Sequence, residues 1–256
     1  MRLLFVLLAH RPGLPSSAAA VPALCILAAT GGVLLIATCL KVLFRSHLIG
    51  HGGERIVRRA LARLGLAALH DVVLADTLGH TQIDHLVRTS QGIAVFETKT
   101  LTGWISGKAH GAQWTQHLAG GRVRHAFQNP VRQNYRHCKA VEAAIGSVAV
   151  PVRGFVVSAG RARFCPELEK AVVPVAELGR ITTADFQAGL VAAGELEVAW
   201  ARVVACAAET PNLRRLHLAE VLAKRTPEQV LAVRMAWGLL PVGVAAVLTG
   251  LVPLVL

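Results

Sequence analysis

Three ionisable residues stand in or beside two neighbouring segments whose composition is otherwise that of apolar β-strands. Asp84 lies in residues 82–89, and Glu97 and Lys99 lie within and just after residues 92–98. Carboxylate oxygens are ligands that Mg²⁺ prefers, and an ammonium group beside them can orient water or stabilise negative charge developing on a phosphorane. The three residues therefore predict metal-dependent hydrolysis of a phosphodiester bond.

The spacing of these residues places them on one side of a predicted hairpin. Side chains alternate between the two faces of a strand, so Glu97 and Lys99 point the same way, and Asp84 on the neighbouring strand can point with them. A solvated strand face with salt bridges explains most triplets of this kind. Burying three ionisable groups among apolar residues is costly unless they are paired or bind a metal ion, which favours the metal site.

The elements that must position this hairpin follow an alternating α/β pattern. An apolar stripe at helical spacing predicts a helix over residues 54–69, with Glu54 in its first turn after a pair of glycines. An Asn-Pro pair opens a helix over residues 129–145, with Gln133 one turn into it. Further strands are expected over residues 71–75, 152–158 and 171–175, and further helices over residues 183–190 and 195–208.

Two long uncharged segments lie near the ends of the chain, which has 256 residues and a mean hydropathy of +0.51. Twenty-nine residues without a charge separate Arg11 from Lys41, and 22 more follow Arg234. Each segment can cross a membrane as a helix, because a hydrocarbon core of about 30 Å needs about 20 apolar residues. The alternatives are a signal peptide at the start of the first segment and a buried core helix for the second.

Basic residues predict the orientation of the central part of the chain. They cluster just after the first uncharged segment and just before the second, so the central part is expected in the cytoplasm and both chain ends outside. The predicted division is an N-terminal segment with a transmembrane helix (1–44), a catalytic domain (45–180), a helical extension (181–234) and a C-terminal transmembrane helix (235–256). The predicted location is the cell (inner) membrane.

The central part is strongly basic. Residues 41–234 hold 25 Lys plus Arg against 15 Asp plus Glu, and residues 84–163 hold 11 against three. A field of this sign favours a polyanion such as nucleic acid. Attraction to an anionic membrane leaflet is the simpler account of the cluster over residues 55–63, but not of charges in mid-domain. The side chains expected to contact nucleic acid are Lys108, Arg122, Arg124, Arg132 and Arg136.

A family resemblance joins these features. Its pieces occur in one order along the chain: Gly53-Glu54, Gln82-Ile83-Asp84-His85, Glu97-Thr98-Lys99, Gly103-Trp104-Ile105-Ser106-Gly107, Trp114, and Asn129-Pro130 with Gln133. In this pattern the chain resembles the nuclease-related domain (NERD) family, which is similar to the PD-(D/E)xK nucleases. The resemblance covers residues 50–146 well and implies a restriction-endonuclease-like mixed sheet flanked by helices.

The resemblance also implies roles for individual residues. Asp84 and Glu97 would bind Mg²⁺ or Mn²⁺, Thr98 would offer its backbone carbonyl as a further ligand, and Lys99 would be the catalytic lysine. Glu54 and Gln133 would complete the site from two helices. The position before Asp84 is isoleucine where the PD-(D/E)xK name calls for proline, as is usual in the nuclease-related family.

The accessory residues also have structural interpretations. Glu54 could be an acid placed at a helix N-terminus for the helix dipole, and Gln133 alone would usually be a surface glutamine. Trp104 and Trp114 are expected to pack in the core or in loops rather than to stack on bases. The histidines show no spacing that predicts a metal site built from imidazoles.

The leading hypothesis is a membrane-anchored, Mg²⁺-dependent nuclease acting on DNA. The first alternative is a non-catalytic nucleic-acid-binding or scaffold protein that keeps the nuclease fold at the membrane. The second is a metal-free membrane protein whose basic domain binds lipid headgroups. The sequence leaves open the oligomeric state, the choice between DNA and RNA, and whether cutting is internal or from an end.

Overall fold

The computed structural model describes residues 17–184 and 191–255. The chain divides into two compact units, which are residues 47–224 and a second unit made of residues 1–46 with 225–256. The candidate catalytic residues all belong to the first of these units.

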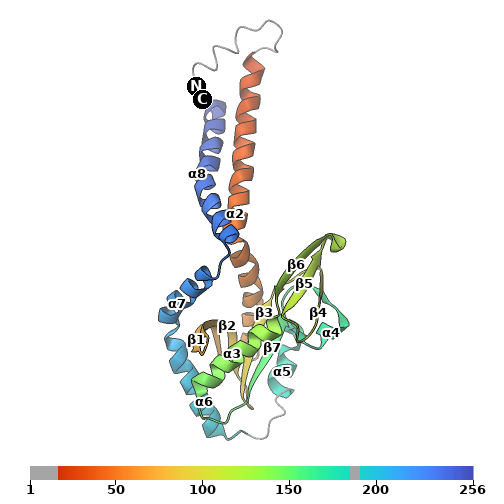
Figure 1. Ribbon diagram of the computed structural model, residues 1–256, viewed down its shortest axis with the longest axis vertical. Coiled ribbons are helices and arrows are strands. Elements are labelled where there is room, and N and C mark those ends of the chain that lie inside the picture. The colour runs from red at the N-terminus through yellow and green to blue at the C-terminus, as the bar shows by residue number, and fades with distance from the viewer. Residues whose placement is uncertain (1–16, 185–190, 256) are drawn as a thin grey trace. The chain divides into compact units, whose positions relative to one another are not determined.

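A mixed five-stranded sheet, called sheet A, forms the centre of residues 47–224. Its strands lie in the order β1-β2-β3-β7-β9, antiparallel from β1 to β3 and parallel from β3 to β9. Their bounds are Ala68–Asp76, Gly79–Arg88, Ile93–Lys99, Val152–Ser158 and Val172–Pro174. The predicted hairpin is β2–β3, and the predicted α/β fold with a mixed sheet flanked by helices is confirmed (Figure 1).

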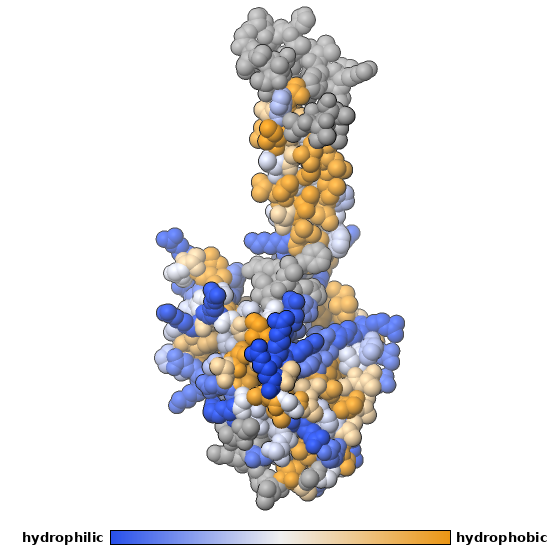
Figure 2. Space-filling view, turned by 180° about the vertical axis from the view of Figure 1, so that it is seen from behind, coloured by the Kyte–Doolittle hydropathy of each residue, from blue (hydrophilic) through white to orange (hydrophobic). Residues whose placement is uncertain are grey.

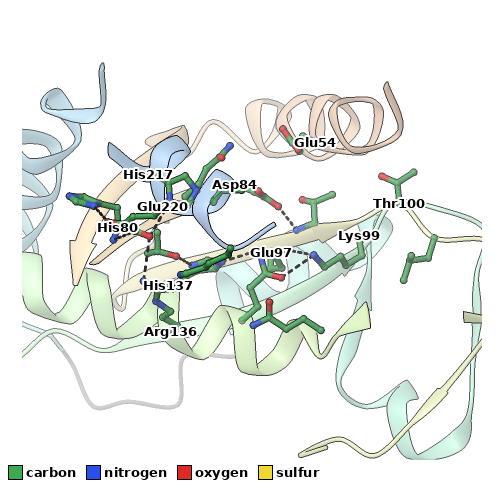
Figure 3. A pocket seen from close by; sticks show the side chains of 18 residues that line it. Glu54, His80, Asp84, Glu97, Lys99, Thr100, Arg136, His137, His217 and Glu220 are labelled. Carbon is green, nitrogen blue, oxygen red and sulfur yellow. Dashed lines mark hydrogen bonds and ion pairs between the residues drawn. The ribbon is translucent and has the colours of Figure 1, made fainter. Parts of the chain in front are cut away.

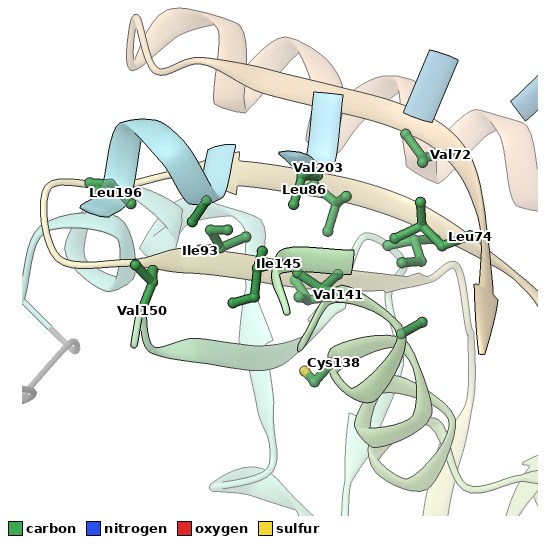
Figure 4. Packing of buried hydrophobic residues seen from close by; sticks show 14 residues of the cluster. Val72, Leu74, Leu86, Ile93, Cys138, Val141, Ile145, Val150, Leu196 and Val203 are labelled. Carbon is green, nitrogen blue, oxygen red and sulfur yellow. The ribbon is translucent and has the colours of Figure 1, made fainter. Parts of the chain in front are cut away.

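Helices cover both faces of sheet A. On one face, α3 (Pro130–Ile145) and α6 (Ala193–Ala208) bury an apolar cluster that includes Leu86 and Val95 of the sheet (Figure 4). On the other face, Val57 and Leu61 from α2 (Ser17–Arg63) and the short α5 (Leu178–Ala184) pack against Phe96. Burial of each such side chain contributes about 1.5–3 kcal/mol, so the sheet is fixed from both sides.

Helix α3 begins and ends where its local sequence predicts. The side chain of Asn129 accepts a hydrogen bond from the backbone N–H of Val131 (2.9 Å), and Pro130 occupies the first position, where the missing N–H costs nothing. Gly146 ends the helix with a positive φ of 66°. The face of α3 that carries Gln133 is thereby held in one register against the sheet.

A second, four-stranded sheet, called sheet B, lies beside sheet A and was not predicted. Its strands lie in the order β6-β5-β4-β8. Their bounds are Val123–Gln128, Gln113–Leu118, Trp104–Gly107 and Arg163–Phe164. Ile105 and Trp114 pack from one face of this sheet against Leu168 of α4 (Pro166–Glu169), so only that face lies in the core.

The predicted helix over residues 54–69 is wrong at both ends. Helix α2 runs unbroken from Ser17 through the glycine pair and ends at Arg63, because Gly65 takes a left-handed conformation (φ 65°) and the chain turns into β1. The helix continues through Gly53, where the lack of a side chain lets α2 pack closely against Thr100 and Ala159. A Cβ there would lie 1.9 Å from Thr100 Oγ1 and 3.1 Å from Ala159 Cβ. Glu54 therefore lies in mid-helix.

The remaining elements complete the chain. The predicted helix over 195–208 corresponds to α6, whereas most of the one predicted over 183–190 lies outside the described residues. Helix α7 (Thr210–Ala223) lies within the predicted helical extension, although no separate helix was expected there, and none of its residues is buried. The bounds of the others are η1 (Ala119–Gly121), η2 (Val175–Glu177) and α8 (Pro227–Val255).

Two helices are long and apolar enough to span a membrane. The segments are Val21–Leu43 of α2 and Pro227–Leu251 of α8, with mean hydropathies of 2.3 and 1.9. Their side chains are mostly exposed, and Figure 2 shows hydrophobic side chains along the helix surfaces. The helices approach closely at Gly32, where a Cβ would lie 2.7 Å from the backbone oxygen of Gly243. A mostly exposed apolar surface argues against the buried core helix considered for the second segment.

Candidate active site

Strand β3 presents Glu97 and Lys99 together, as side-chain alternation predicts. Lys99 Nζ lies 2.6 Å from Glu97 Oε1, and the Glu97 side chain is 2% exposed whereas that of Lys99 is 25% exposed. The flanking Val95 and Phe96 pack on opposite faces of sheet A. Glu97 therefore lies within the buried sheet, whereas Lys99 is partly exposed and can contact a bound molecule.

Asp84 faces this pair from strand β2. Its Oδ2 accepts a hydrogen bond from the backbone N–H of Thr98 (2.7 Å). Burial, together with the negative charges of Glu97 and Glu54, raises the pKa of Asp84 to about 8, against the opposing effects of the Thr98 hydrogen bond and the Lys99 charge. The ionised form of Asp84 is therefore disfavoured both by burial and by its two negative neighbours.

The second oxygen of Glu97 is held by a histidine. His137 Nε2 lies 3.1 Å from Glu97 Oε2, and His137 Nδ1 lies 2.9 Å from Thr81 Oγ1. Burial acts to raise the pKa of Glu97, but the hydrogen bond with His137 and the charge of Lys99 outweigh it, so that pKa lies below its ordinary value. Glu97 is consequently an oriented carboxylate with a partner on each oxygen.

Gln133 and His137 reach the site from one face of α3. They are four residues apart, so they lie one above the other on the helix. Gln133 Oε1 accepts a hydrogen bond from Lys99 Nζ (3.1 Å). Gln133 is therefore a partner of the lysine rather than a surface glutamine.

Glu54 comes to the site from α2. It lines the same cavity as Asp84, and its side chain is 23% exposed with His51 Nδ1 3.4 Å from its Oε2. Because Glu54 lies in mid-helix, a role as an acid at a helix N-terminus is excluded. The absence of a side chain at Gly53 lets this turn of α2 lie against Thr100, directly after strand β3.

These side chains line a cavity of about 560 Å³ (Figure 3). One wall comes from α7, which was not part of the predicted site. There His80 Nδ1 lies 2.6 Å from Glu220 Oε1, and the backbone oxygen of His80 accepts a hydrogen bond from His217 Nδ1 at 3.0 Å. Asp84, Glu97, Lys99, Glu54 and Gln133 all line this cavity, so the structure brings together every predicted side chain of the catalytic set.

Sequence reasoning missed His137 and the pair His80–Glu220. A signal for His137 existed, because it follows Gln133 by four residues on a helix whose face had been assigned to the site. No local signal existed for the other pair, since its members are 140 residues apart in the chain.

The predicted nucleic-acid contacts fall into two groups. Arg136 lines the cavity, but its guanidinium is held by Asp76, with Nε 2.6 Å from Oδ2. The other four are exposed and lie outside the lining of the cavity; they are Lys108, Arg122, Arg124 and Arg132. Of the two tryptophans, Trp114 is fully buried, as expected, whereas Trp104 is 43% exposed.

The donor set suits a hard divalent cation. Asp84 and Glu97 offer carboxylate oxygens and Thr98 offers a backbone carbonyl. Burial and the charges of Glu97 and Glu54 raise the pKa of Asp84, so a cation beside it would stabilise its ionised form. Among the described residues, no three or more His, Cys, Asp or Glu side chains form a ready cluster for a metal ion. Water and substrate would therefore have to supply further ligands, as is usual for Mg²⁺.

Comparisons with known proteins agree with the predicted resemblance. Residues 49–159 match the family model described as nuclease-related domain. Over 97 residues the chain is 43% identical to an uncharacterized protein of Bacillus anthracis. This alignment covers 36% of this chain and 45% of the relative. The match thus spans less than half of the relative's length. A solved crystal structure of a protein of unknown function aligns over 75% of this chain and 98% of its own, with 11% identity and a TM-score of 0.31.

Proposed function

From the nuclease-related domain that residues 49–159 carry, we propose that this protein is a membrane-anchored, metal-dependent nuclease that hydrolyses phosphodiester bonds of DNA. The observation that carries the proposal is the convergence of Asp84, Glu97 and Lys99 in one open cavity. An ion pair that only stabilised the fold would have no need of a second, uncompensated carboxylate beside it.

Asp84, Glu97 and the carbonyl of Thr98 would hold Mg²⁺ or Mn²⁺. Bound there, such an ion would supply Lewis-acid activation of the phosphodiester and a more acidic water. The protein's contribution is orientation: His137 fixes one oxygen of Glu97, and the backbone N–H of Thr98 fixes one oxygen of Asp84. Both carboxylates are thus held before any ligand arrives.

Lys99 would act directly on the substrate. Its ammonium is held between Glu97 and Gln133 and is still partly exposed to the cavity, so it can donate a hydrogen bond to a phosphoryl oxygen as negative charge develops. Glu54 stands at the more open side of the same cavity, where its carboxylate can accept a proton from the attacking water. These roles give each member of the set a separate task.

The charge pattern supports nucleic acid as substrate. Between Glu97 and Glu142 there are seven Lys plus Arg and no Asp or Glu. The membrane anchor is proposed from the two apolar helices, and the cytoplasmic orientation from the basic residues that flank them. Such a protein would act on DNA that lies at the inner face of the cell membrane.

The test is a cleavage assay with the full chain in detergent. Plasmid and linear DNA, and RNA in parallel, are incubated with Mg²⁺, Mn²⁺ or EDTA. We expect cutting that needs the metal ion and that falls by at least about 100-fold in Asp84→Ala and Lys99→Ala. The exposed Lys170→Ala is the matched control and should cut as the wild type does.

Two outcomes would count against catalysis. If the wild type cuts nothing with either metal ion, or if Asp84→Ala and Lys99→Ala cut as well as the control, the enzymatic proposal is wrong. DNA retardation without any cutting would instead support the non-catalytic binding protein.

A further inference from the structure

The hairpin of strands β5 and β6 extends away from sheet A and ends in an open tip (Figure 1). Ala119, Gly120 and Gly121 all have positive φ there, and a Cβ at either glycine would meet nothing within 4 Å. Strand β6 is the edge strand of sheet B, and five of its six residues are exposed. The hairpin therefore offers a ribbon of two strands to a large partner rather than to a pocket-sized ligand.

The base of the hairpin is rigidly held. Trp114 of β5 is fully buried, contacts the Phe127 ring at 6.3 Å between centroids, and donates from Nε1 to the Lys108 backbone oxygen at 3.1 Å. Asn129, directly after β6, donates from Nδ2 to the backbone oxygens of Ala109 and Gly111. The orientation of the ribbon is thus fixed relative to the start of α3, which carries Gln133 into the candidate site.

One face of β6 runs from the tip into the cavity. Arg124, Ala126 and Gln128 share this face by alternation, and Gln128 lines the cavity beside Gln133. His117 is the cross-strand partner of Arg124, so it lies on the same face. The path from the tip to the candidate site is lined by uncharged or basic groups.

The arginines at the outer end of this path are available to a ligand. Arg122 and Arg124 are exposed, and neither forms an ion pair among the described residues. By contrast, Arg88, Arg136 and Arg214 each pair with a carboxylate. The region 98–141, which includes the whole hairpin, contains no acidic residue at all.

We propose that the β5–β6 hairpin is an arm that binds duplex nucleic acid, with Arg122 and Arg124 contacting phosphates about six base pairs from the one in the catalytic cavity. The proposal rests on the proposed nuclease function and names the form of its substrate. The six residue-to-residue steps from Arg122 to Gln128 span about 20 Å at about 3.3–3.4 Å each. A duplex rises about 3.4 Å per base pair, which gives the six base pairs.

A duplex fits this arm better than a single strand does. A two-stranded ribbon is narrow enough for the major groove, which is about 12 Å wide. Single-strand binding relies on a series of exposed aromatic rings on which successive bases stack. Residues 122–126 include no Phe, Tyr or Trp, Phe127 faces Trp114, and the exposed Trp104 belongs to β4 and not to the arm. Two exposed arginines can supply the phosphate contacts that position a protein on a duplex.

The test measures binding rather than cutting. Fluorescence anisotropy of labelled duplexes is recorded with the full chain in detergent and EDTA, for wild type and Arg122→Ala/Arg124→Ala. The control is Arg215→Ala/Lys170→Ala, which removes two exposed charges elsewhere. We expect the arm variant to bind on the order of tenfold more weakly, with a salt slope shallower by about 2, and the control to bind as the wild type does.

A length series tests the geometry. Wild-type affinity should increase as the duplex grows beyond about six base pairs, and the arm variant should lose this increase. Equal losses in the arm variant and the control, or equal affinity for single strands and duplexes, would overturn the proposal. Circular dichroism and thermal unfolding of both variants show whether either change has disturbed the fold.

The outcomes also separate the arm from the catalytic proposal. If the wild type binds duplexes through the arm but does not cut them with Mg²⁺ or Mn²⁺, the arm proposal holds and the nuclease proposal is wrong. If the wild type cuts and the arm variant binds every duplex as tightly as the wild type does, the nuclease proposal holds and the arm proposal is wrong.

Discussion

The buried Glu97 and the partly buried Asp84 are in opposite electrostatic states. Glu97 has Lys99 on one oxygen and His137 on the other, and its pKa is lowered. Asp84 has one backbone N–H as a partner, and burial together with the charges of Glu97 and Glu54 raises its pKa to about 8. Lys99 and His137 stabilise the charge of Glu97, whereas no cation among the described residues pairs with Asp84 in the same way. The free energy of binding a cation in this site should therefore depend mainly on Asp84.

Replacing Asp84 should therefore stabilise the metal-free protein. In EDTA at pH 9, where Asp84 is mostly ionised, Asp84→Asn removes a buried repelling charge and should raise the free energy of unfolding by on the order of 1–3 kcal/mol. Mg²⁺ should then raise the unfolding temperature of the wild type but not of Asp84→Asn. Thermal unfolding followed by circular dichroism checks both, with the exposed Glu169→Gln as control; a variant less stable than the wild type in EDTA would contradict this account.

The Asp76–Arg136 pair should make stability depend on acid pH. Burial acts to raise the pKa of Asp76, but the hydrogen bonds from Arg136 and Leu78 and the Arg136 charge outweigh it, so the pKa is lowered. A depressed carboxyl pKa stabilises the fold above the unfolded-state pKa of about 4, and this contribution is lost as the pH falls through the folded-state value.

Asp76→Asn should accordingly cost about 1–2 kcal/mol at pH 6 to 7, and the difference from wild type should vanish toward pH 2. Urea unfolding at a series of pH values measures it. A difference that stays constant from pH 7 to pH 2 would show that the loss arises from packing instead of charge.

Among the helices and strands, the sequence predicted the elements that depend on interactions between residues close together in the chain. The hairpin β2–β3 follows from apolar strands around a turn, and α3 follows from Asn129 and Pro130. Because alternation is a property of the strand itself, the shared face of Glu97 and Lys99 was predictable as well.

The missed elements depend on contacts between distant segments. Strand β5 is mostly polar and part-buried and β6 is mostly exposed, so no apolar alternation marks them, and their order depends on Trp114 packing in the core. The glycine pair before Glu54 resembled a helix boundary, yet the helix continues because Gly53 packs against Thr100. Neither effect leaves a signature within a short window of sequence.

The contact at Gly53 can be tested by a paired substitution. Ala is favoured over Gly within a helix by about 1 kcal/mol, so Gly53→Ala alone would stabilise α2 if space allowed. Because the new Cβ would meet Thr100 Oγ1 at 1.9 Å, we expect instead a loss of stability of on the order of 1 kcal/mol and a weaker response to Mg²⁺ as Glu54 is displaced.

Removing the obstructing hydroxyl should reverse this loss. Thr100 Oγ1 is buried without a hydrogen-bond partner, so Thr100→Ala alone should be nearly neutral, and Gly53→Ala/Thr100→Ala should regain most of the stability. Thermal unfolding of the four proteins gives the coupling energy. Simple additivity of the two changes would show that the contact does not limit the packing of α2.

At the level of the whole molecule, charge and hydropathy are segregated along the chain. All 15 acidic residues and 25 of the 27 basic ones lie between Lys41 and Arg234, and the two apolar helices flank this part. A domain between two spans leaves the segments beyond the spans on the same side of the membrane, opposite to the domain. The basic flanks predict that the domain is on the cytoplasmic side.

Reporter fusions in a bacterial host test this topology. Alkaline phosphatase, which is active only outside the cytoplasm, should be inactive when fused after Lys224 and active when fused after Leu251, beyond the second span. Green fluorescent protein at the same positions should give the opposite pattern. An active phosphatase after Lys224 would place the domain of residues 47–224 outside the cytoplasm and would contradict the proposal of a cytoplasmic DNA substrate.

Helix α7 also bears on what counts as the functional module of this protein. The family match ends at residue 159, yet Glu220 and His217 form a wall of the cavity that contains Asp84 and Lys99. A fragment of this chain that ended at residue 159 would therefore carry the candidate catalytic side chains in an unfinished cavity.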